Sequence, residues 1–161
     1  MVQAGGGLAV IHVRATRRVW IAAALVCASC LGLTSCVAND STTEIRLFLA
    51  QKPGPEDVLP AVLTAASTGL DAASGRFVGS NRDVNYFVSK YTDPQRGTPG
   101  FCLMVVKLPD GPSNSSCGSA DGMWTSGSGT GGARVIESND NVPEGWTRLS
   151  DFLIVNPDAT P

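Results

Sequence analysis

Histidine is almost absent from this chain of 161 residues, whose one histidine, His12, lies close to the N-terminus. The residues after Ser35 contain none, so they cannot form a Ser-His-Asp or Cys-His nucleophilic arrangement. They also lack the side chain that most often binds metal ions in proteins. The greater part of the sequence therefore offers no sign of the commonest forms of nucleophilic or zinc-dependent catalysis.

Charged side chains are scarce as well, at 16% of all residues. Residues 1–35 contain three arginines and no acidic residue, whereas residues 36–161 contain nine basic and fourteen acidic residues, a formal charge of −5. This acidic part has no cluster of Lys and Arg that could neutralise nucleic-acid phosphates. It also cannot bind anionic lipid headgroups by charge alone. We therefore expect no nucleic-acid partner.

An uncharged apolar run from Val19 to Leu33 follows Arg17 and Arg18. A basic flank, an apolar stretch and a small-residue cleavage site are the three parts of a secretory signal. The run is shorter than the roughly 20 apolar residues of a spanning helix, although a membrane anchor that stays uncut is the alternative. We predict that residues 1–35 are a signal peptide.

The sequence LTSC at residues 33–36 resembles the lipobox of bacterial lipoproteins. That motif has an aliphatic residue, a small residue, then Gly, Ala or Ser, then an obligatory cysteine. The resemblance implies cleavage between Ser35 and Cys36 and a diacylglycerol on the Cys36 thiol. Cys27 and Cys30 fit less well, because Cys30 has a cysteine and Cys27 an alanine at the aliphatic position.

The lipobox resemblance also implies a location and a partner. The protein would be lipid-anchored in the cell membrane and face the extracytoplasmic side, with residues 36–43 as its tether. Each buried CH2 of the acyl chains contributes about 0.8 kcal/mol to membrane binding. No cofactor is expected besides this covalent lipid. Partners beyond the membrane would be an envelope protein or an envelope glycan.

Cys102 and Cys117 remain once the predicted signal peptide is removed and Cys36 is acylated. Two cysteines in an exported domain predict a disulfide. A reactive pair or a metal site is the alternative, but neither a CxxC spacing nor another soft ligand lies near them. We predict a structural disulfide and no metal site.

Two helical segments are predicted ahead of the strands. The sequence STTE at 41–44 has the form of a capping box, and Ile45, Phe48 and Leu49 recur on one helical face. A second, shorter helix is expected within residues 56–68.

From Arg76 onward, alternating apolar residues and turn residues predict strands. The strand-like segments are RFVG, VNYFVSKY, GFCLMVVK, SSCGS, MWTS, ARVIES and GWTRLSDFLIVN. The turn sequence PDGP would bring Cys117 beside Cys102. We predict one small α+β domain at 44–156: an N-terminal helical piece, then a disulfide-stapled antiparallel sheet of about five or six strands. A loose tail would follow at 157–161.

Several of these segments together resemble small exported or membrane-tethered proteins common in actinobacteria. The segments are RFVG, VNYFV, GFCLMVV, SSCGS and PEGWTRLSDFLIV, and the resemblance covers most of residues 70–155. It implies the same location and fold class, and it assigns no catalytic residue.

Two patterns in the domain could carry chemistry. The sequence GSGTGG at 127–132 matches GxGxxG, but it precedes a strand-like segment instead of a helix, so a loop is favoured over a dinucleotide site. Glu137, Asp140 and Glu144 could supply the paired carboxylates of a glycoside hydrolase. Turns favour acidic residues for local reasons, however, and we predict no catalytic residue.

Trp124 and Tyr86 are the candidates for a binding surface, since aromatic side chains combine apolar area with a polar tip. Phe101 and Trp146 are instead expected in the core. The overall expectation is a membrane-anchored, non-enzymatic lipoprotein that serves as a structural or binding module of the cell envelope. The alternatives are a His-independent carboxylate hydrolase acting on envelope glycans, or an inhibitor or partner subunit with an exposed apolar patch around Trp124.

Overall fold

A computed structural model gives the structure of the chain and describes residues 40–66 and 68–159. The chain divides into two units, Met1–Ala38 and Asn39–Pro161. The predicted signal peptide, Ser35 and the proposed lipid site at Cys36 lie outside the described residues. All helices and strands of the described residues belong to the second unit.

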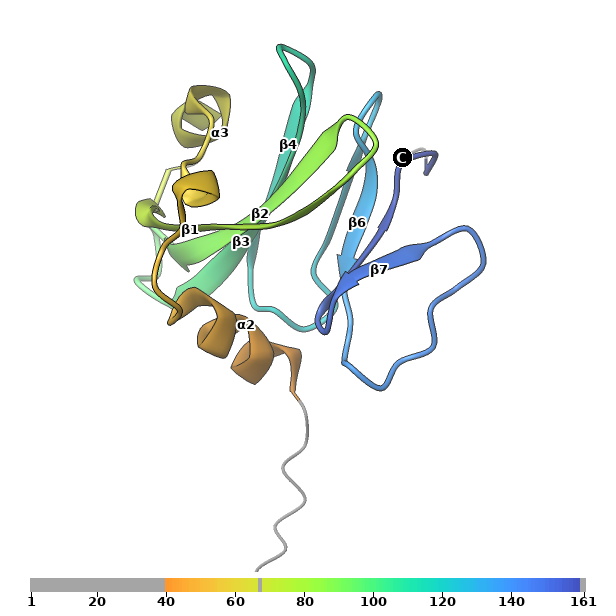
Figure 1. Ribbon diagram of the computed structural model, residues 1–161. Coiled ribbons are helices and arrows are strands. Elements are labelled where there is room, and N and C mark those ends of the chain that lie inside the picture. Colours follow the sequence, from red (N-terminus) through yellow and green to blue (C-terminus); the bar gives the residue numbers. More distant parts are fainter. Residues whose placement is uncertain (1–39, 67, 160–161) are drawn as a thin grey trace, which may run out of the picture. The chain divides into compact units, whose positions relative to one another are not determined.

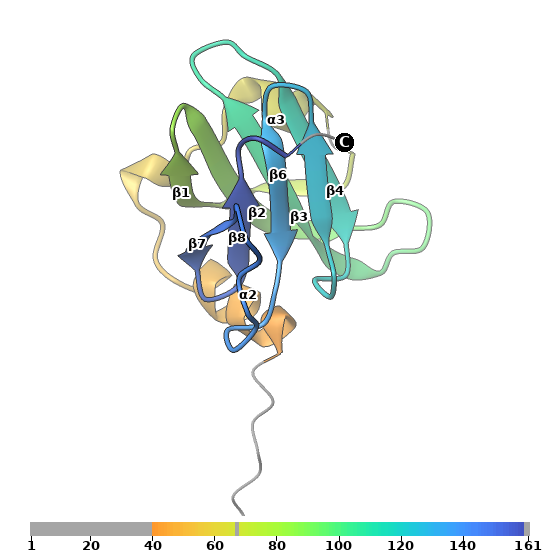
Figure 2. The same ribbon diagram turned by 90° about the vertical axis from the view of Figure 1, so that its right-hand side faces the viewer.

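The described residues form two four-stranded antiparallel sheets, seen as two layers in Figure 2. Sheet A has the order β1-β2-β3-β4, with β1 at Leu70–Asn81, β2 at Val84–Thr92, β3 at Pro99–Lys107 and β4 at Ser113–Gly118. Sheet B has the order β5-β6-β8-β7, with β5 at Trp124–Gly127, β6 at Gly131–Val135, β7 at Thr147–Ser150 and β8 at Leu153–Asn156. At the two margins, β4 lies beside β5 and β1 lies beside β7.

The prediction of an α+β domain with a single sheet of five or six strands is therefore wrong, because the fold is mostly β and has two sheets. Strand β1 begins at Leu70, ahead of the predicted start at Arg76. Its first residues have low strand propensity, yet they are held by pairing with β2. The closing segment contains two strands, because the chain turns at Asp151 and Phe152 and returns as β8.

One apolar cluster fills the space between the sheets. Sheet A contributes Val84, Tyr86, Val88, Phe101, Leu103 and Val105, and sheet B contributes Ala133, Val135, Leu153 and Val155. The intervening residues of β2 and β3 belong to a second cluster on the other face of sheet A. Because β3 is covered on both faces, residues 101–106 are all buried. Strand β3 is therefore the most buried strand of sheet A.

Three helical elements complete the unit, namely α2 at Ser41–Leu49, the 3-10 turn η1 at Pro55–Asp57 and α3 at Ala61–Ala66. Helix α2 lies across one end of the two sheets (Figure 1) and buries Ile45 and Leu49 in the inter-sheet cluster, as its sequence spacing predicted. Leu59 and Leu63, near η1 and in α3, cover the second cluster. Both clusters lie within residues 45–155, so the second unit contains its own complete core. Among the residues that the structure describes, no helix is both long and apolar enough to span a membrane.

The N-terminus of α2 differs from the predicted capping box. Asp40 is the N-cap, and its carboxylate accepts a hydrogen bond from the Thr42 N–H at 3.0 Å. Ser41 is already the first helical residue and is buried. The predicted cap was wrong by one residue, because Asp accepts the N2 amide as well as Ser does.

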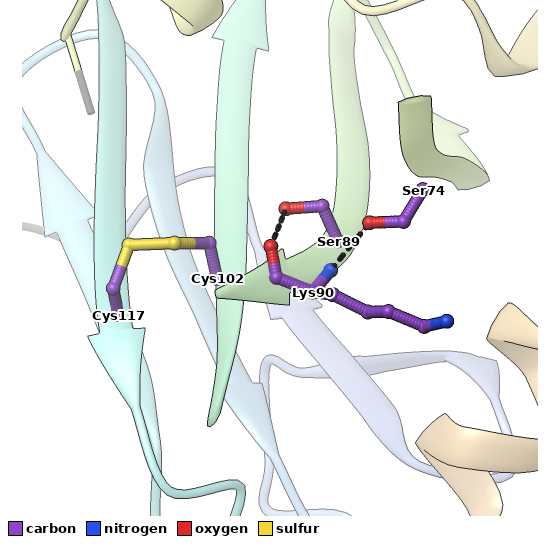
Figure 3. Close-up of a disulfide and its surroundings, with 5 residues drawn as sticks. All are labelled: Ser74, Ser89, Lys90, Cys102 and Cys117. Atoms are coloured by element: carbon purple, nitrogen blue, oxygen red, sulfur yellow. Dashed lines mark hydrogen bonds between the residues drawn. A yellow bond between two sulfur atoms is a disulfide. The ribbon is translucent and has the colours of Figure 1, made fainter. Parts of the chain in front are cut away.

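The predicted disulfide between Cys102 and Cys117 is confirmed, and it joins facing positions of β3 and β4 (Figure 3). The turn between the two strands contains the predicted PDGP sequence, and the Gly111 N–H donates to the Lys107 carbonyl at 2.9 Å. Cys102 is fully buried in the second cluster. The bond therefore fastens β4, the edge strand of sheet A, to its most buried strand.

Candidate functional site

The outer face of sheet B carries the exposed tryptophan that the sequence singled out. Ala133 and Val135 of β6 point into the inter-sheet core, so the intervening Arg134 points outward, because successive side chains alternate across a strand. Trp124 is the register partner of Arg134 on β5 and therefore shares its outward face. Its side chain is 55% exposed, which agrees with the prediction of a surface position.

The same row of side chains continues across the sheet. Ile154 of β8 pairs with Arg134 on one side and with Arg148 of β7 on the other. Trp146 packs over the same face, because a Cβ built on Gly132 would lie 3.2 Å from its ring. We call Trp124, Arg134, Trp146 and Arg148 the aromatic–cation face.

The Gly-rich turn between β5 and β6 places Trp124 opposite Arg134. Gly129 and Gly131 have φ values of +81° and +69°, which side chains other than glycine rarely adopt. The Thr130 hydroxyl accepts a hydrogen bond from the Asn114 amide at 2.7 Å, which links this turn to β4. A strand follows GSGTGG and pairs antiparallel with the strand before it. The loop interpretation is confirmed, and this setting does not match a dinucleotide fingerprint.

The two arginines of the aromatic–cation face differ in their bonding. Arg148 donates to the main-chain oxygens of Asp140 and Asp151, at 2.7 and 3.0 Å, and so holds the loop before β7. The guanidinium of Arg134 forms neither a hydrogen bond nor an ion pair with any described residue. Arg134 also borders a small hollow of about 200 Å³ whose lining includes carboxylates. One cation on this face is thus fixed, and the other is free to bind a ligand.

The surroundings of Trp124 are polar instead of apolar. Arg134 faces it directly, and Ser126 and Gly132 form the next pair along the two strands. Among the described residues, the other exposed large apolar side chains are Leu47, Val58, Val62, Leu108 and Val142, and none of these lies on the strands of sheet B. The apolar patch expected for an inhibitor or partner subunit is therefore not found around Trp124.

The second predicted surface residue, Tyr86, needs a correction. Its side chain has no exposed area and belongs to the inter-sheet cluster, so it cannot contact a ligand in this structure. Burial raises the pKa of its phenol to about 12. Phe101 lies in the core, as expected. Trp146, also expected in the core, is only partly buried and packs on the outer face.

The candidate catalytic carboxylates lie on the surface. Glu137, Asp140 and Glu144 are all exposed. The Asp140 carboxylate accepts a hydrogen bond from the Glu137 N–H at 3.0 Å, which is a local turn interaction. Within residues 40–66 and 68–159, no three His, Cys, Asp or Glu side chains are grouped so that they could hold a metal ion. Glu137 and Asp140 both line the hollow that Arg134 borders.

Comparisons of the chain with protein-family models, with curated proteins and with solved structures gave no match.

Proposed function

We propose that the chain is a lipid-anchored, extracytoplasmic binding module that recognises an acidic glycan of the cell envelope. The anchor rests on the lipobox at residues 33–36. Export is supported by the Cys102–Cys117 disulfide, because such bonds persist in oxidising compartments and are rare in the cytosol.

The tether of such a protein would be short. Three residues, 37–39, separate Cys36 from Asp40, the N-cap of α2. An extended chain spans at most about 3.6 Å per residue, so about 14 Å would separate the lipidated cysteine from the start of the folded unit. A module held this closely would meet ligands of the envelope layer next to the membrane.

The observation that carries the proposed ligand is the exposed Trp124 opposite the unpaired Arg134. An indole face offers a sugar ring a flat apolar surface beside a polar rim. A free guanidinium forms strong, charge-assisted hydrogen bonds with carboxylates and phosphates. Together these groups fit an acidic polysaccharide better than a neutral glycan or an apolar protein surface.

The anchor is tested by replacing Cys36 with Ser in cells fed labelled palmitate. We expect the wild-type chain to take up the label and to fractionate with membranes, and the variant to do neither. The matched control is Cys30→Ser, which should keep the label. Labelling of the Cys36→Ser protein would overturn the anchor.

Ligand binding is tested by affinity electrophoresis of residues 39–161 in gels containing a uronic-acid polysaccharide. We expect wild-type protein to be retarded, and Trp124→Ala and Arg134→Gln each to weaken the retardation at least about fivefold. Leu108→Ala, which removes an exposed side chain outside sheet B, is the control and should behave as wild type. Equal migration of wild type and Trp124→Ala would reject the proposed ligand.

A further inference from the structure

A second hollow lies on the inner face of sheet A, where α2 passes near the ends of β1, β2 and β3. Its volume is about 290 Å³, close to the lower limit for small-molecule sites. Asp71, Lys90 and Phe101 form one cross-strand row of its lining, since Lys90 pairs with Asp71 on β1 and with Phe101 on β3. Arg46 of α2 completes this side of the hollow.

The two cations of this hollow have no partner in the part of the chain that the structure describes. Among the described residues, neither the Arg46 guanidinium nor the Lys90 ammonium forms a hydrogen bond or an ion pair. Asp71 stands opposite Lys90 across the two strands, yet no ion pair joins them. Residues 36–161 carry a formal charge of −5, so a hollow with two free cations and one carboxylate has the opposite sign to the net charge of this part of the chain.

The position of Lys90 is fixed by its backbone. Its N–H donates to the Ser74 hydroxyl at 2.8 Å, and the Ser74 hydroxyl donates to the Asp71 carbonyl at 2.7 Å. These bonds close the irregular stretch of β1 between Asp71 and Arg76. Figure 3 shows the Lys90 side chain extending away from the disulfide. The ammonium group therefore projects from an anchored point of β2.

The rest of the lining is mainly apolar. Phe101 is 8% exposed and belongs to the inter-sheet core, whereas the Tyr91 side chain packs against the second cluster on the other face of sheet A. Pro99 adds a rigid apolar rim. The hollow thus combines an apolar wall with two cations, which is the arrangement that an anionic head and a short apolar tail require.

We propose that this hollow binds a small free amphiphilic anion, with its carboxylate or phosphate between Arg46 and Lys90 and its apolar tail against Phe101 and Pro99. The site is separate from the aromatic–cation face and does not rest on the proposed glycan binding. Arg supplies paired donors to such a head, and Lys supplies a point charge. A neutral molecule of the same shape would leave both cations without a partner.

The proposal is tested by NMR titration of residues 39–161 with hexanoate and phenyl phosphate, using hexanamide as the neutral match. We expect saturable shifts of the Thr92 and Gly100 amides with both anions and none with hexanamide. Vesicles of phosphatidylglycerol form a second arm. Binding to vesicles without binding of either free anion would overturn the proposal, because the hollow would then recognise a bilayer surface.

Variants that change the charge of the hollow should alter its affinity for hexanoate in opposite directions. Arg46→Gln and Lys90→Gln should each weaken hexanoate binding about fivefold or more, whereas Asp71→Asn should tighten it about twofold because the one carboxylate is removed. The matched controls are Lys52→Gln and Asp110→Asn, which make the same charge changes outside this hollow and should alter little. Absence of saturable shifts in wild type, or equal effects of Lys90→Gln and Lys52→Gln, would overturn the proposal. Circular dichroism of every variant separates loss of binding from loss of folding.

Discussion

The Arg76 guanidinium lies 3.7 Å from the Asp57 carboxylate, and the two side chains are 9% and 11% exposed. Arg76 also donates to the main-chain oxygens of Leu49 and Gln51, at 3.4 and 3.1 Å. Leu49 is the last residue of α2 and Gln51 lies just beyond its C-cap, where a helix leaves its last oxygens without intrahelical partners. A single cation of β1 therefore completes the C-terminus of the helix that closes the sandwich.

Asp57 has an equally central position. Its two carboxylate oxygens accept hydrogen bonds from the main-chain N–H groups of Gly54 and Phe77, at 2.8 and 2.7 Å. The pair consequently joins α2, η1 and β1, although α3 lies between η1 and β1 in the sequence. Burying such a pair costs desolvation energy, so the pair itself adds little stability. Removing one partner is strongly destabilising, however, because the other charge is then buried without compensation.

Replacing Arg76 with Met should lower the free energy of unfolding by about 3 kcal/mol, because it leaves the Asp57 carboxylate buried without its cation. Urea denaturation followed by circular dichroism measures this change. The control is Arg96→Met, whose pairing with Asp93 involves an arginine side chain that is 80% exposed. That variant should leave stability nearly unchanged. Similar midpoints for Arg76→Met and wild type would contradict a structural role for the pair.

Removing the disulfide should also destabilise the fold. Cys102 and Cys117 are separated by 15 residues, and closing a loop of that size stabilises by about 3 kcal/mol in the chain-entropy model. The double variant Cys102→Ala, Cys117→Ala should therefore unfold at lower urea, and reduction of wild type should reproduce much of the shift. Reduction of the double variant should change nothing. Alkylation of either thiol in unreduced, unfolded wild-type protein would show that the bond is absent in solution.

Two features of this fold could be predicted from short stretches of sequence. The face of α2 followed from the spacing of Ile45 and Leu49, and the disulfide followed from a turn between two strand-like segments. Each of these depends on contacts that are close in sequence. They could be predicted because helical periodicity and turn chemistry act over a few residues.

The division into two sheets depends on distant contacts and was missed. Strand β8 pairs with both β6 and β7, and nothing local in LIVN specifies two partners. Tyr86 was misplaced for a related reason. Strand β2 is covered by apolar clusters on both faces, so its sequence shows no clean alternation from which an outward face could be assigned.

The aromatic–cation face was found only in part. Trp124 could be singled out because a tryptophan beside a Gly-rich turn is unlike a core residue. Arg134 was overlooked, although the alternation in GARV places it opposite to Ala133 and Val135. Its pairing with Trp124 required the register of the β5–β6 hairpin, which the three residues between Gly127 and Gly131 set.

Asp40 is the N-cap of α2, whereas its neighbour Ser41 is the first residue of the helix. Replacing Asp40 with Ala should cost about 1 kcal/mol, because the Thr42 N–H loses its acceptor at the start of the helix. Ser41→Ala is the control, because it removes no capping bond, and its effect should be smaller. Thermal or urea unfolding of both variants measures the difference. A larger loss for Ser41→Ala than for Asp40→Ala would restore the capping box predicted from the sequence.

The Tyr86 hydroxyl is buried between the sheets and has no hydrogen-bond partner among the described residues. A buried polar group without a partner costs free energy, whereas a phenyl ring of the same shape does not. Tyr86→Phe should therefore raise the free energy of unfolding at neutral pH, by about 1 kcal/mol. A loss of stability in this variant would show that the hydroxyl has a partner in solution.

Alkaline pH gives a second and independent readout of the same group. Burial raises the pKa of Tyr86 from 10.0 to about 12 in the folded protein. Below pH 10 both states keep the phenol proton, so this group adds no pH dependence. Between pH 10 and 12 the unfolded chain releases the proton and the folded chain retains it, so the unfolded state binds fewer protons and stability falls as pH rises.

The fall should be absent from Tyr86→Phe, so the difference between the two proteins isolates the contribution of this phenol. Urea unfolding at several pH values from 8 to 11.5 measures it. Tyr91→Phe removes the other tyrosine hydroxyl and should leave the wild-type fall in place. Parallel pH profiles for wild type and Tyr86→Phe would mean that the phenol ionises as readily in the folded protein as in the unfolded chain. The hydroxyl would then reach water, and Tyr86 would regain a place on the protein surface.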